Sequence, residues 1–373
     1  MSWPMVKLGT LVTIKTGRLD ANAAEDTGIY PFFTCSRESL KINSYAFDCD
    51  AILIAGNGDL NVKHYSGKFN AYQRTYVITT NSNDILNTRY LFYFMDKYVE
   101  RLRVLSIGGV IKYIKIGMLT DVEIPLPCLT EQKRIAAILD KAYGTLQKRE
   151  QSIKLADDFL RATFLDMFGD PVENPKRWDV TSLLEYGSFK NGMNFSKGES
   201  GATLKCLGVG DFKSLTTITC MDNIGEIELN ILPSTDYLLN DGDLVFVRSN
   251  GNKALVGRCL TIYPGKEKVT FSGFCIRYRI ENTSITPEYL NFLFRTPSMK
   301  QQMLSGGQGA NIQNISQGTL STLRIPVPPL DKQLAFARLV DFHASIVKKQ
   351  YDKMAESEKL FDALTGDFFT FNE

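Results

Sequence analysis

Histidine and paired cysteine are scarce in this sequence. The 373 residues contain only two histidines, His64 and His343, and the seven cysteines are scattered with no Cys-x-x-Cys pair. A zinc site of the usual spacing needs such clusters, so the sequence excludes one. Together with the missing signal peptide, the unpaired cysteines predict reduced thiols and a cytoplasmic protein.

Long apolar runs and a complete phosphate loop are also missing. No apolar run approaches the roughly 18 residues of a membrane span, so we expect no membrane segment. The segment Ser305–Asn311 is rich in glycine, yet it lacks the closing Gly-Lys-Ser/Thr that would hold a nucleotide. It is either a flexible backbone that approaches a ligand closely or a plain loop.

What remains is the composition of an ordinary globular protein. Apolar residues make up 44% of the chain, charged residues make up 23%, and the formal net charge is +2. A chain of this length can bury two full hydrophobic cores. The net charge excludes no class of partner, so the distribution of charge along the chain is more informative than its sum.

Three motifs occur twice, in the same order. The first shares Trp, Leu, Lys and Gly in step, the second shares an Asp-x-Asp start and an Asn-Gly end, and the third has the pattern Ile-Pro-x-Pro-x-Leu-x-x-Gln. A period of about 200 residues is far longer than a solenoid unit. The sequence therefore predicts a duplicated domain with approximate two-fold symmetry. The matching pairs are Trp3–Gly17 with Trp178–Gly192, Asp48–Gly58 with Asp241–Gly251, and Ile124–Gln132 with Ile325–Gln333.

Residues 1–129 and 171–330 have the composition of two mixed α+β domains. They are rich in Gly, aromatic and β-branched residues, and we expect one helix in each, over Thr88–Leu105 and Pro287–Leu304. The prediction is a pair of duplicated α/β domains. Short apolar strands between Gly and Asn turns are expected at Ala51–Ile54, Thr75–Ile78, Asp243–Val247 and Phe274–Tyr278.

Residues 130–170 and 331–373 differ from the domains, because they contain no proline and repeat an apolar residue at every seventh position. This spacing, sustained over five repeats, is typical of a coiled coil. We expect Thr130 and Asp331 to cap the N-termini of two long helices, and Gly169 to end the first helix. The predicted seam residues are Leu139, Leu146, Ile153, Leu160 and Met167, with Val340, Val347, Met354, Phe361 and Phe368.

The order of the segments predicts how they are arranged. One long helix leaves the first domain and ends at the second, and the other runs back, so the two should pair antiparallel between the domains. Each would be roughly 58 Å long. Arg149 and Gln350 would then form a polar layer midway, and His343 would lie in a companion row of the seam. Alternatively, Gly144 breaks the first helix and the pair forms a short bundle.

Basic and amide residues gather in the loops of both domains. The stretch Asn61–Asn83 contains no acidic residue, and Arg248–Lys268 contains five basic residues against one Glu. His64 falls in the first stretch beside Lys63, in what we interpret as a polar loop. Basic, amide-rich loops suit phosphate contacts and base readout, although one such stretch alone is usually a solvated face. Their duplication favours nucleic-acid binding.

Together, these motifs resemble the specificity (S) subunit of type I restriction-modification systems. The resemblance rests on the duplicated Trp-x-x-x-x-Leu start and on the Ile-Pro-x-Pro-x-Leu-x-x-Gln pattern that opens each long helix. The Gly-rich loop before that pattern and the segment Met167-Phe-Gly-Asp-Pro171 add to it. The resemblance covers essentially the entire chain. One departure is Cys128, where the second repeat has Pro329.

The resemblance implies two target recognition domains that each read half of a split double-stranded DNA site. It implies that the chain is not an enzyme and binds no cofactor itself. Two modification subunits would dock on the helices and bring S-adenosylmethionine, and restriction subunits would bring cleavage that depends on ATP and Mg. The implied segments are recognition domain 1 (1–129), helix 1 (130–170), recognition domain 2 (171–330) and helix 2 (331–373).

Residues that read bases differ freely across this family, so the candidates come from composition alone. They are basic and amide side chains of the repeated Lys-x-Gly motif and of the predicted loops. These loops are 57–63, 68–74 and 111–115 in the first domain and 248–253 and 308–314 in the second, with Arg258 in addition. In the first domain they are Lys15, Asn57, Asn61, Lys63, Lys68, Arg74, Lys112 and Lys115. In the second domain they are Lys190, Arg248, Asn250, Asn252, Lys253, Arg258, Gln308, Asn311, Gln313 and Asn314.

Two other classes of function compete with this interpretation. A self-contained DNA adenine methyltransferase needs an Asn/Asp-Pro-Pro-Tyr/Phe tetrapeptide for the flipped base, and neither Asn174-Pro-Lys nor Asn282-Thr-Ser fits it. A coiled-coil scaffold that binds only proteins is the other class. The duplicated domains with basic, amide-rich loops argue against such a scaffold.

Overall fold

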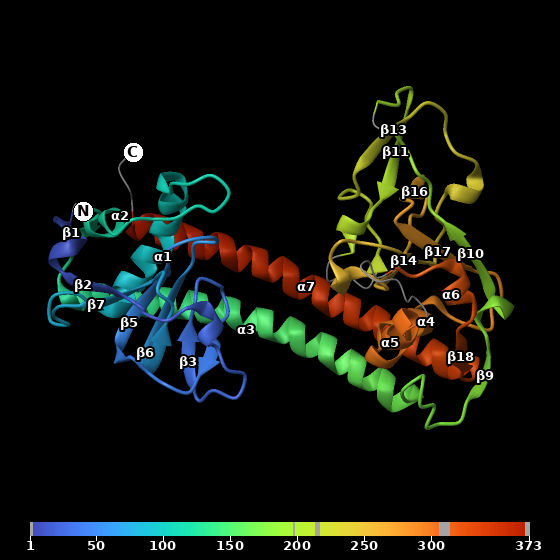
Figure 1. The fold of residues 1–373 in the computed structure, drawn as a ribbon, viewed down its shortest axis with the longest axis horizontal. Coiled ribbons are helices and arrows are strands. Elements are labelled where there is room, and N and C mark those ends of the chain that lie inside the picture. Colours follow the sequence, from blue (N-terminus) through green and yellow to red (C-terminus); the bar gives the residue numbers. More distant parts are fainter. Residues whose placement is uncertain (1–2, 197, 213–216, 306–313, 370–373) are drawn as a thin grey trace. The chain divides into compact units, whose positions relative to one another are not determined.

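The computed structural model describes residues 3–196, 198–212, 217–305 and 314–369. The chain forms two compact units: unit 1 takes residues 1–151 and 350–373, and unit 2 takes residues 152–349. Each unit therefore holds one sheet domain together with one half of each long helix. Figure 1 labels most of the elements of both units.

Unit 1 contains a six-stranded mixed sheet in the order β2-β7-β5-β6-β3-β4. Strands β3 and β6 pair in parallel, and the other neighbours are antiparallel. A separate two-stranded sheet pairs β1 with β8. The strands are β1 (Met5–Lys7), β2 (Val12–Thr16), β3 (Tyr30–Phe33), β4 (Leu40–Ile42), β5 (Phe47–Ala55), β6 (Val62–Ala71), β7 (Thr75–Thr80) and β8 (Glu123–Pro125).

The central strand β5 is buried on both faces because a separate core covers each one. On one face, Ile52 packs with helix α1 (Thr88–Leu105), which lies against the sheet (Figure 1). On the other face, Leu53 packs in a smaller cluster that includes Phe69. This burial explains why Ala51–Ala55 reads as a continuous apolar run. The predicted helix Thr88–Leu105 is confirmed at both ends.

Unit 2 repeats the central strands in the order β10-β17-β14-β15, with β12 added at the edge. A three-stranded sheet, β13-β11-β16, repeats the pairing of β4, β3 and β6, including the parallel pair. Strands β9 and β18 repeat the small sheet of β1 and β8. The strands are β9 (Asp179–Ser182), β10 (Gly187–Asn191), β11 (Ala202–Leu207), β12 (Thr217–Ile218), β13 (Glu226–Leu229), β14 (Asp243–Val247), β15 (Cys259–Ile262), β16 (Val269–Phe271), β17 (Cys275–Ile280) and β18 (Arg324–Val327).

The single helix predicted over Pro287–Leu304 is wrong, because it is two helices. Helix α4 spans Pro287–Arg295, and α5 spans Pro297–Ser305. Thr296 between them is extended, with φ −65° and ψ 143°. A proline disfavours the helical conformation of the residue before it and is well placed at the start of a new helix, so Pro297 explains the break. Short helices α2 (Gly117–Thr120) and α6 (Gln317–Ser321) precede the last strand of each domain.

Two long helices follow the domains, α3 (Leu129–Phe168) and α7 (Leu330–Phe368). Their first turns are bonded from the carbonyls of Cys128 and Pro329, so the predicted N-caps, Thr130 and Asp331, already lie inside the helices. Helix α3 continues through Gly144, so the alternative in which Gly144 breaks it is wrong.

Gly169 ends α3 as predicted. Its φ is 80°, and its N–H donates to the carbonyl of Leu165 at 2.8 Å. A glycine in this left-handed conformation is a common C-terminal cap, because it has no side chain to clash. Within the described ranges, no helix is both long enough and apolar enough to cross a membrane.

In unit 1, the first half of α3 runs antiparallel to the second half of α7. The rings of Tyr143 and Phe361 lie 6.0 Å apart between centroids. Six residues further along α3, Arg149 donates a hydrogen bond to Gln350 Oε1 at 3.3 Å. Residue numbers rise along α3 as they fall along α7, which fixes the antiparallel direction in this unit. Arg149 and Gln350 meet as the sequence predicted.

In unit 2, the second half of α3 runs antiparallel to the first half of α7. Phe164 packs on Phe336 with 5.4 Å between ring centroids. His343, which the heptad pattern places in a companion row, has Nε2 3.1 Å from Asp157 Oδ1. The distance is that of an ion pair. The contact is not a hydrogen bond, and His343 Nε2 is buried without a hydrogen-bond partner.

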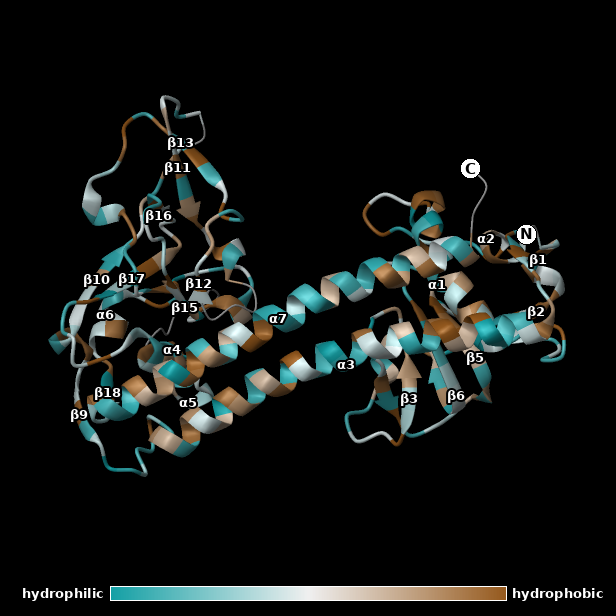
Figure 2. Cartoon of the chain, turned by 180° about the vertical axis from the view of Figure 1, so that it is seen from behind, coloured by the Kyte–Doolittle hydropathy of each residue, from teal (hydrophilic) through white to brown (hydrophobic). Residues whose placement is uncertain are grey.

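The burial of both long helices follows the seven-residue spacing. Every predicted seam residue is buried or partly buried, whereas most positions between them are exposed. Figure 2 shows apolar residues recurring between polar ones along both helices. The buried members are Leu139, Ile153 and Leu160, and the partly buried members are Leu146, Met167, Val340, Val347, Met354, Phe361 and Phe368.

The repeated Gln that opens each long helix is a buried anchor. In unit 1, Gln132 donates to the carbonyls of Ile85 and Pro127 at 2.9 Å and accepts from the N–H of Asn87 at 2.8 Å. In unit 2, Gln333 makes the three equivalent bonds. Each Gln thus ties the start of a long helix to the start of the helix that covers the sheet.

The repeated Lys-x-Gly motif is explained by a close backbone approach. A Cβ atom on Gly17 would lie 1.8 Å from the carbonyl oxygen of Ala71, and one on Gly192 would lie 2.0 Å from that of Ser272. No side chain fits at either position without moving the neighbouring strand. The glycine is therefore required by the sheet and is not evidence of a ligand.

Candidate nucleic-acid interface

In unit 1, the Asn57 turn after β5 is joined to the segment after α1. The N–H of Gly58 donates to the carbonyl of Lys112 at 2.9 Å, and the N–H of Ile114 donates to that of Gly56 at 2.9 Å. Asn57 and Tyr113 form a β-bridge between these two bonds. The structure thus brings together two of the loops that composition singled out, 57–63 and 111–115.

In unit 2, the equivalent turn makes the same connection with a register shifted by one residue. Ser249 forms a β-bridge with Asn314, and the N–H of Ile315 donates to the carbonyl of Arg248 at 3.0 Å. Asn250 is partly buried and Asn314 is exposed. The predicted residues Gln308, Asn311 and Gln313 lie outside the described residues.

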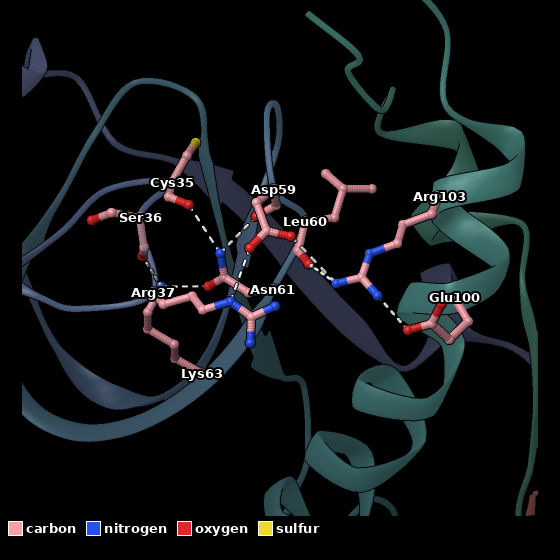
Figure 3. A network of polar contacts seen from close by, with 9 residues as sticks. All are labelled: Cys35, Ser36, Arg37, Asp59, Leu60, Asn61, Lys63, Glu100 and Arg103. Carbon is pink, nitrogen blue, oxygen red and sulfur yellow. Dashed lines mark hydrogen bonds and ion pairs between the residues drawn. The ribbon is translucent and has the colours of Figure 1, made fainter. Parts of the chain in front are cut away.

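Polar contacts fix the unit 1 turn from inside (Figure 3). Asn61 Nδ2 donates to the carbonyls of Cys35 and Asp59 at 2.9 and 2.8 Å. Lys63 Nζ donates to the carbonyl of Ser36 at 2.7 Å and to Asn61 Oδ1 at 2.5 Å. Burial lowers the pKa of the Lys63 ammonium. Asn61 and Lys63 therefore stabilise the turn, and Lys63 lies in β6 rather than in the predicted loop.

The same turn is tied to the end of α1. Arg103 Nη2 donates to the carbonyl of Leu60 at 2.8 Å and lies 3.5 Å from Asp59 Oδ1, and its other terminal nitrogen pairs with Glu100 (Figure 3). Asp59 also pairs with Arg37 at 2.9 Å, which holds the pKa of its carboxyl below the usual range. Sequence reasoning missed Arg37 and Arg103, because their partners are distant in the chain.

The repeated lysines Lys15 and Lys190 differ in their surroundings. Lys15 is exposed on the edge strand β2. Lys190 Nζ pairs with Asp236 Oδ2 at 3.0 Å and lies 4.3 Å from the ring centre of Tyr237. An ammonium that already has a carboxylate partner gains less from a phosphate, so Lys15 is the better candidate of the two for a phosphate contact.

Lys68 and Arg74 are both exposed, but only Arg74 lies in a loop. Lys68 lies within β6, and its Nζ is 4.7 Å from the ring centre of Tyr45. The predicted loop from Lys68 to Arg74 therefore begins inside a strand, contrary to the sequence interpretation. The carbonyl of Arg74 accepts from the N–H of Gly56 at 2.8 Å, which places Arg74 beside the Asn57 turn.

In unit 2, the candidate residues of the 248–258 segment combine structural and exposed groups. Asn250 and Asn252 each accept a backbone N–H two residues on, at 2.7 and 3.0 Å, and so shape the turn. Arg258 Nη1 donates to the carbonyl of Phe212 at 3.1 Å. Lys253 is exposed and Arg248 is partly exposed. These two are the cations best placed for a phosphate.

His64 is part of a network that sequence reasoning did not find. It lies in β6, not in a polar loop, and its Nε2 is 2.7 Å from Asp50 Oδ1. Its Nδ1 is 3.2 Å from Arg89 Nη1, and Arg89 Nε donates to Asp140 Oδ1 at 2.9 Å. The network links the sheet to α1 and α3, which indicates a structural role for His64.

The comparisons with known proteins agree with the duplicated architecture. The family model of the type I restriction modification DNA specificity domain matches residues 2–155 and again residues 175–353. Both repeats therefore have the features that define this class of DNA-specificity domain. The chain belongs to the family of type I restriction-modification DNA specificity proteins.

Relatives and a solved structure cover nearly the full chain. The Escherichia coli type I restriction enzyme EcoDI specificity subunit is 30% identical, with 94% of this chain and 84% of that protein covered. The Methanocaldococcus jannaschii MjaVIII specificity subunit is 23% identical, with 96% and 90% covered. The fold resembles the crystal structure of a type I restriction-modification S subunit from M. genitalium, with a TM-score of 0.58, 16% identity, and 100% and 97% covered.

These findings decide between the classes of function left open by the sequence. The relatives are named as specificity subunits, in agreement with the prediction of a non-catalytic DNA-recognition subunit. A self-contained methyltransferase and a scaffold that binds only proteins are not favoured.

Proposed function

We propose that this chain reads a bipartite, asymmetric DNA site, with unit 1 reading one half and unit 2 reading the other. The observation that carries the proposal is the duplicated turn at Asn57 and Asn250, which is bonded to a second loop in each unit. An Asn side chain suits the donor and acceptor edge of adenine. The two turns differ in sequence, Gly56–Asn61 against Ser249–Lys253, so the half-sites should differ.

Exposed or partly exposed cations of each unit would supply the phosphate contacts. In unit 1 they are Lys15, Lys68, Arg74, Lys112 and Lys115, and in unit 2 they are Arg248 and Lys253. Phosphate contacts position a protein on the duplex, and contacts to base edges select the sequence. Asn57 and Asn314 are the proposed base-reading residues among those described, whereas Asn250 shapes its own turn, because its Oδ1 accepts the N–H of Asn252.

Exchanging one domain tests independent reading. Replacing residues 1–127 by the equivalent region of a relative with another site should change one half of the recognised motif and leave the other unchanged. The motif is obtained by sequencing methylated bases in a host that carries the chain with its modification partner. A change in both halves would contradict the proposal. Salt-dependent binding of a DNA duplex by the pure chain would distinguish a DNA-reading protein from a scaffold that binds only proteins.

The two long helices would form one antiparallel coiled coil that separates the half-sites. The burial of the seam residues at seven-residue spacing supports this arrangement, as does the antiparallel pairing inside each unit. A 40-residue helix is about 60 Å long, so the pair would act as a ruler for the unread spacer. The layer of Arg149 and Gln350 would fix the register.

Lengthening both helices tests the ruler. Inserting one heptad after Gln147 and one after Lys348 keeps the seam in phase and adds about 10 Å, or roughly 3 base pairs. Those pairs also rotate one half-site by roughly 100°, since a turn takes about 10.5 base pairs. We expect weaker binding, with any remaining recognition shifted to a longer spacer. Retention of the original spacer would show that the partner subunits set the distance.

Two modification subunits would dock on the outward sides of α3 and α7, one beside each domain. In unit 2 this side is apolar, because Phe159 and Phe342 are 69% and 65% exposed and lie at matching heights on the antiparallel helices. Leu155 and Ile346 are also exposed there. Helices with such faces usually pack against further helices. S-adenosylmethionine, ATP and Mg would be held by the modification and restriction subunits and not by this chain.

Native mass spectrometry of the assembled complex tests the docking. We expect two modification chains per S chain, and no methyl transfer by the pure S chain alone. Changing Phe159 and Phe342 to serine should weaken capture of one modification chain, whereas K141S, the same replacement at the unit 1 counterpart of Phe342, should not. A one-to-one complex under saturating partner, or full capture by the double variant, would contradict the proposed surface.

A further inference from the structure

The loop between α1 and α2 is closed at its neck and held in one shape. Ile107 and Tyr113 exchange two backbone hydrogen bonds, at 3.0 and 2.8 Å. Gly108 has φ 114°, and a Cβ on it would lie 2.5 Å from the carbonyl oxygen of Ile111. The tip, residues 108–112, is therefore a tight turn that needs glycine at this position. We call this element the 107–113 loop.

The tip of the 107–113 loop carries two apolar side chains that point into solvent. Val110 is 103% exposed, the highest value among the large apolar residues described, and Ile111 is 64% exposed. An isolated exposed apolar residue is ordinary. Two adjacent ones at the apex of a closed turn are less so, since exposure forgoes the free energy that burying them would give. The arrangement favours a surface that is covered in a complex.

Charge around the tip selects the partner. From Arg101 to Thr120 the sequence contains no acidic residue, and Lys112 and Lys115 are exposed on either side of Tyr113. An apolar tip beside two cations complements a duplex, whose phosphates flank stacked apolar bases. A protein partner would have to supply acidic groups around an apolar pocket, which is a more specific requirement.

The position of the 107–113 loop agrees with this partner. Its neck is bonded to the Asn57 turn through Gly58 and Lys112, at 2.9 Å, and that turn is braced by Arg103. The hydroxyl of Tyr76 donates to the carbonyl of Ile114 at 3.1 Å and adds a further fixed point. The tip is thus held at a set distance from the proposed base-reading residue of unit 1.

We propose that Val110 and Ile111 form an apolar wedge that inserts between base pairs beside the half-site read by unit 1, with Lys112 and Lys115 on the neighbouring phosphates. This proposal depends on the proposed DNA-reading function of unit 1. Apolar side chains inserted at a base step unstack it and bend the duplex. Sequence selectivity would then include how easily that step is deformed, in addition to direct readout by Asn57.

The test compares the double variant V110A/I111A with I29A, because Ile29 is 73% exposed in the same unit and lies outside the loop. Both are assembled with the modification partner and bound to a synthetic duplex that carries the motif found by methylation sequencing. Bending is followed by energy transfer between dyes at the two duplex ends. Affinity is measured over a series of salt concentrations.

We expect V110A/I111A to reduce the bend and weaken binding roughly tenfold or more, since five methyl or methylene groups leave the contact. The slope of log K against log salt should stay unchanged, because no charge is removed. I29A should behave as the parent chain. Replacing Lys112 and Lys115 by alanine should lower the slope by about 2 and affect all sequences alike.

Unchanged bend and affinity in V110A/I111A would overturn the wedge and leave DNA reading by unit 1 intact. Loss of the modification subunit from the double variant, seen by native mass spectrometry, would overturn it in favour of a protein contact. Failure of the parent complex to select its own motif would reject the proposed function itself. Circular dichroism melting of both variants separates these outcomes from misfolding.

Discussion

The two units share the order of their strands and differ in the segments that join those strands. The strand order β2-β7-β5-β6 of unit 1 returns as β10-β17-β14-β15 in unit 2, and the parallel pair β3–β6 returns as β11–β16. Strand β6 is continuous, whereas its counterpart is interrupted between β15 and β16 by residues 263–268. From Gly17 to Asp48 the chain advances 31 residues, but from Gly192 to Asp241 it advances 49.

The comparison separates residues that attach each domain to the long helices from residues that vary. The anchors Gln132 and Gln333 make the same three bonds, and Tyr90 and Tyr289 both donate to the carbonyl of the first proline of the repeated motif, at 2.7 and 2.6 Å. Some other positions of α1 and α4 differ in charge between the units. A duplicated protein can thus change what each half reads while keeping one way of joining the halves.

Charge at matching helix positions shows how far this freedom extends. Arg89 of α1 pairs with Asp140 of α3, whereas its counterpart Glu288 accepts from the hydroxyl of Tyr263 at 2.5 Å. Seven residues on, Asp96 in unit 1 corresponds to Arg295 in unit 2. At these two matching positions, the helices that cover the sheets carry side chains of opposite charge in the two units.

The largest effect is expected at the glycines that both units require. G17A and G192A should each destabilise their own unit by about 4 kcal/mol or more, because the added Cβ meets a strand carbonyl. G225A, where a Cβ would meet nothing within 4 Å, is the matched control. Chemical unfolding of the full chain measures the change. A mild effect in only one unit would show that the two scaffolds are not equivalent.

Removing the shared anchors comes next. Q132A and Q333A should each cost on the order of 3 kcal/mol, because three buried backbone groups lose their partner in each case. Q151A, at an exposed position of α3, should change stability little. Differential scanning calorimetry should show similar losses of stability for Q132A and Q333A. Losses that differ several-fold would contradict the equivalence of the two anchors.

The partly buried side chains of Asp96 and Arg295 extend the comparison between the units to the pH dependence of stability. Burial raises the pKa of Asp96 to about 6, although Arg103 and Arg37 oppose the shift, and burial lowers the pKa of Arg295. Because the folded pKa of Asp96 lies above its unfolded value, its contribution is present below about pH 4 and is lost as pH rises through 6.

D96N should therefore leave stability nearly unchanged at pH 4 and raise it by about 3 kcal/mol above pH 7. No such titration is expected for R295M in this window, since an arginine remains charged throughout it. Urea unfolding at several pH values tests both. A gain by D96N that is equal at all pH values would rule out titration of Asp96 as its cause.

The smallest expected effect concerns the repeated lysines. K15A should lower the salt slope of DNA binding by about 0.9, the value for one phosphate contact. K190A should lower it less, because Asp236 already pairs with that ammonium. Equal decreases in salt slope for both variants would indicate that the Lys190–Asp236 ion pair breaks when the protein binds DNA.

Much of the architecture could be predicted because it depends on local pattern. The seven-residue spacing, the Gly169 stop and the bounds of α1 follow from periodicity and turn chemistry, which act over a few residues. The predicted helix over 287–304 failed where the local signal of Pro297 was overlooked. The predicted caps were off by two residues, since Cys128 and Pro329 take that position.

The candidate interface could be predicted less well, because composition does not tell which cations are already paired. Lys63 counts as a basic loop residue in the sequence, yet its ammonium is bonded to Ser36 and Asn61. Asn252 likewise is bonded to the N–H of Ala254 and shapes its own turn. Partners distant in the chain decide these cases, and no single-residue property reveals them.

The sequence by itself determined the duplication, the two long helices and the class of DNA-specificity protein. Each of these follows from repeated motifs or from the regular spacing of apolar residues. Only the tertiary structure decided that the Asn57 turn meets the 107–113 loop, that Gln132 anchors a helix, and that Val110 is left in water. The physical reason is that contacts between distant segments depend on how strands pair and helices cover them. That pairing is fixed by the packing of the whole unit.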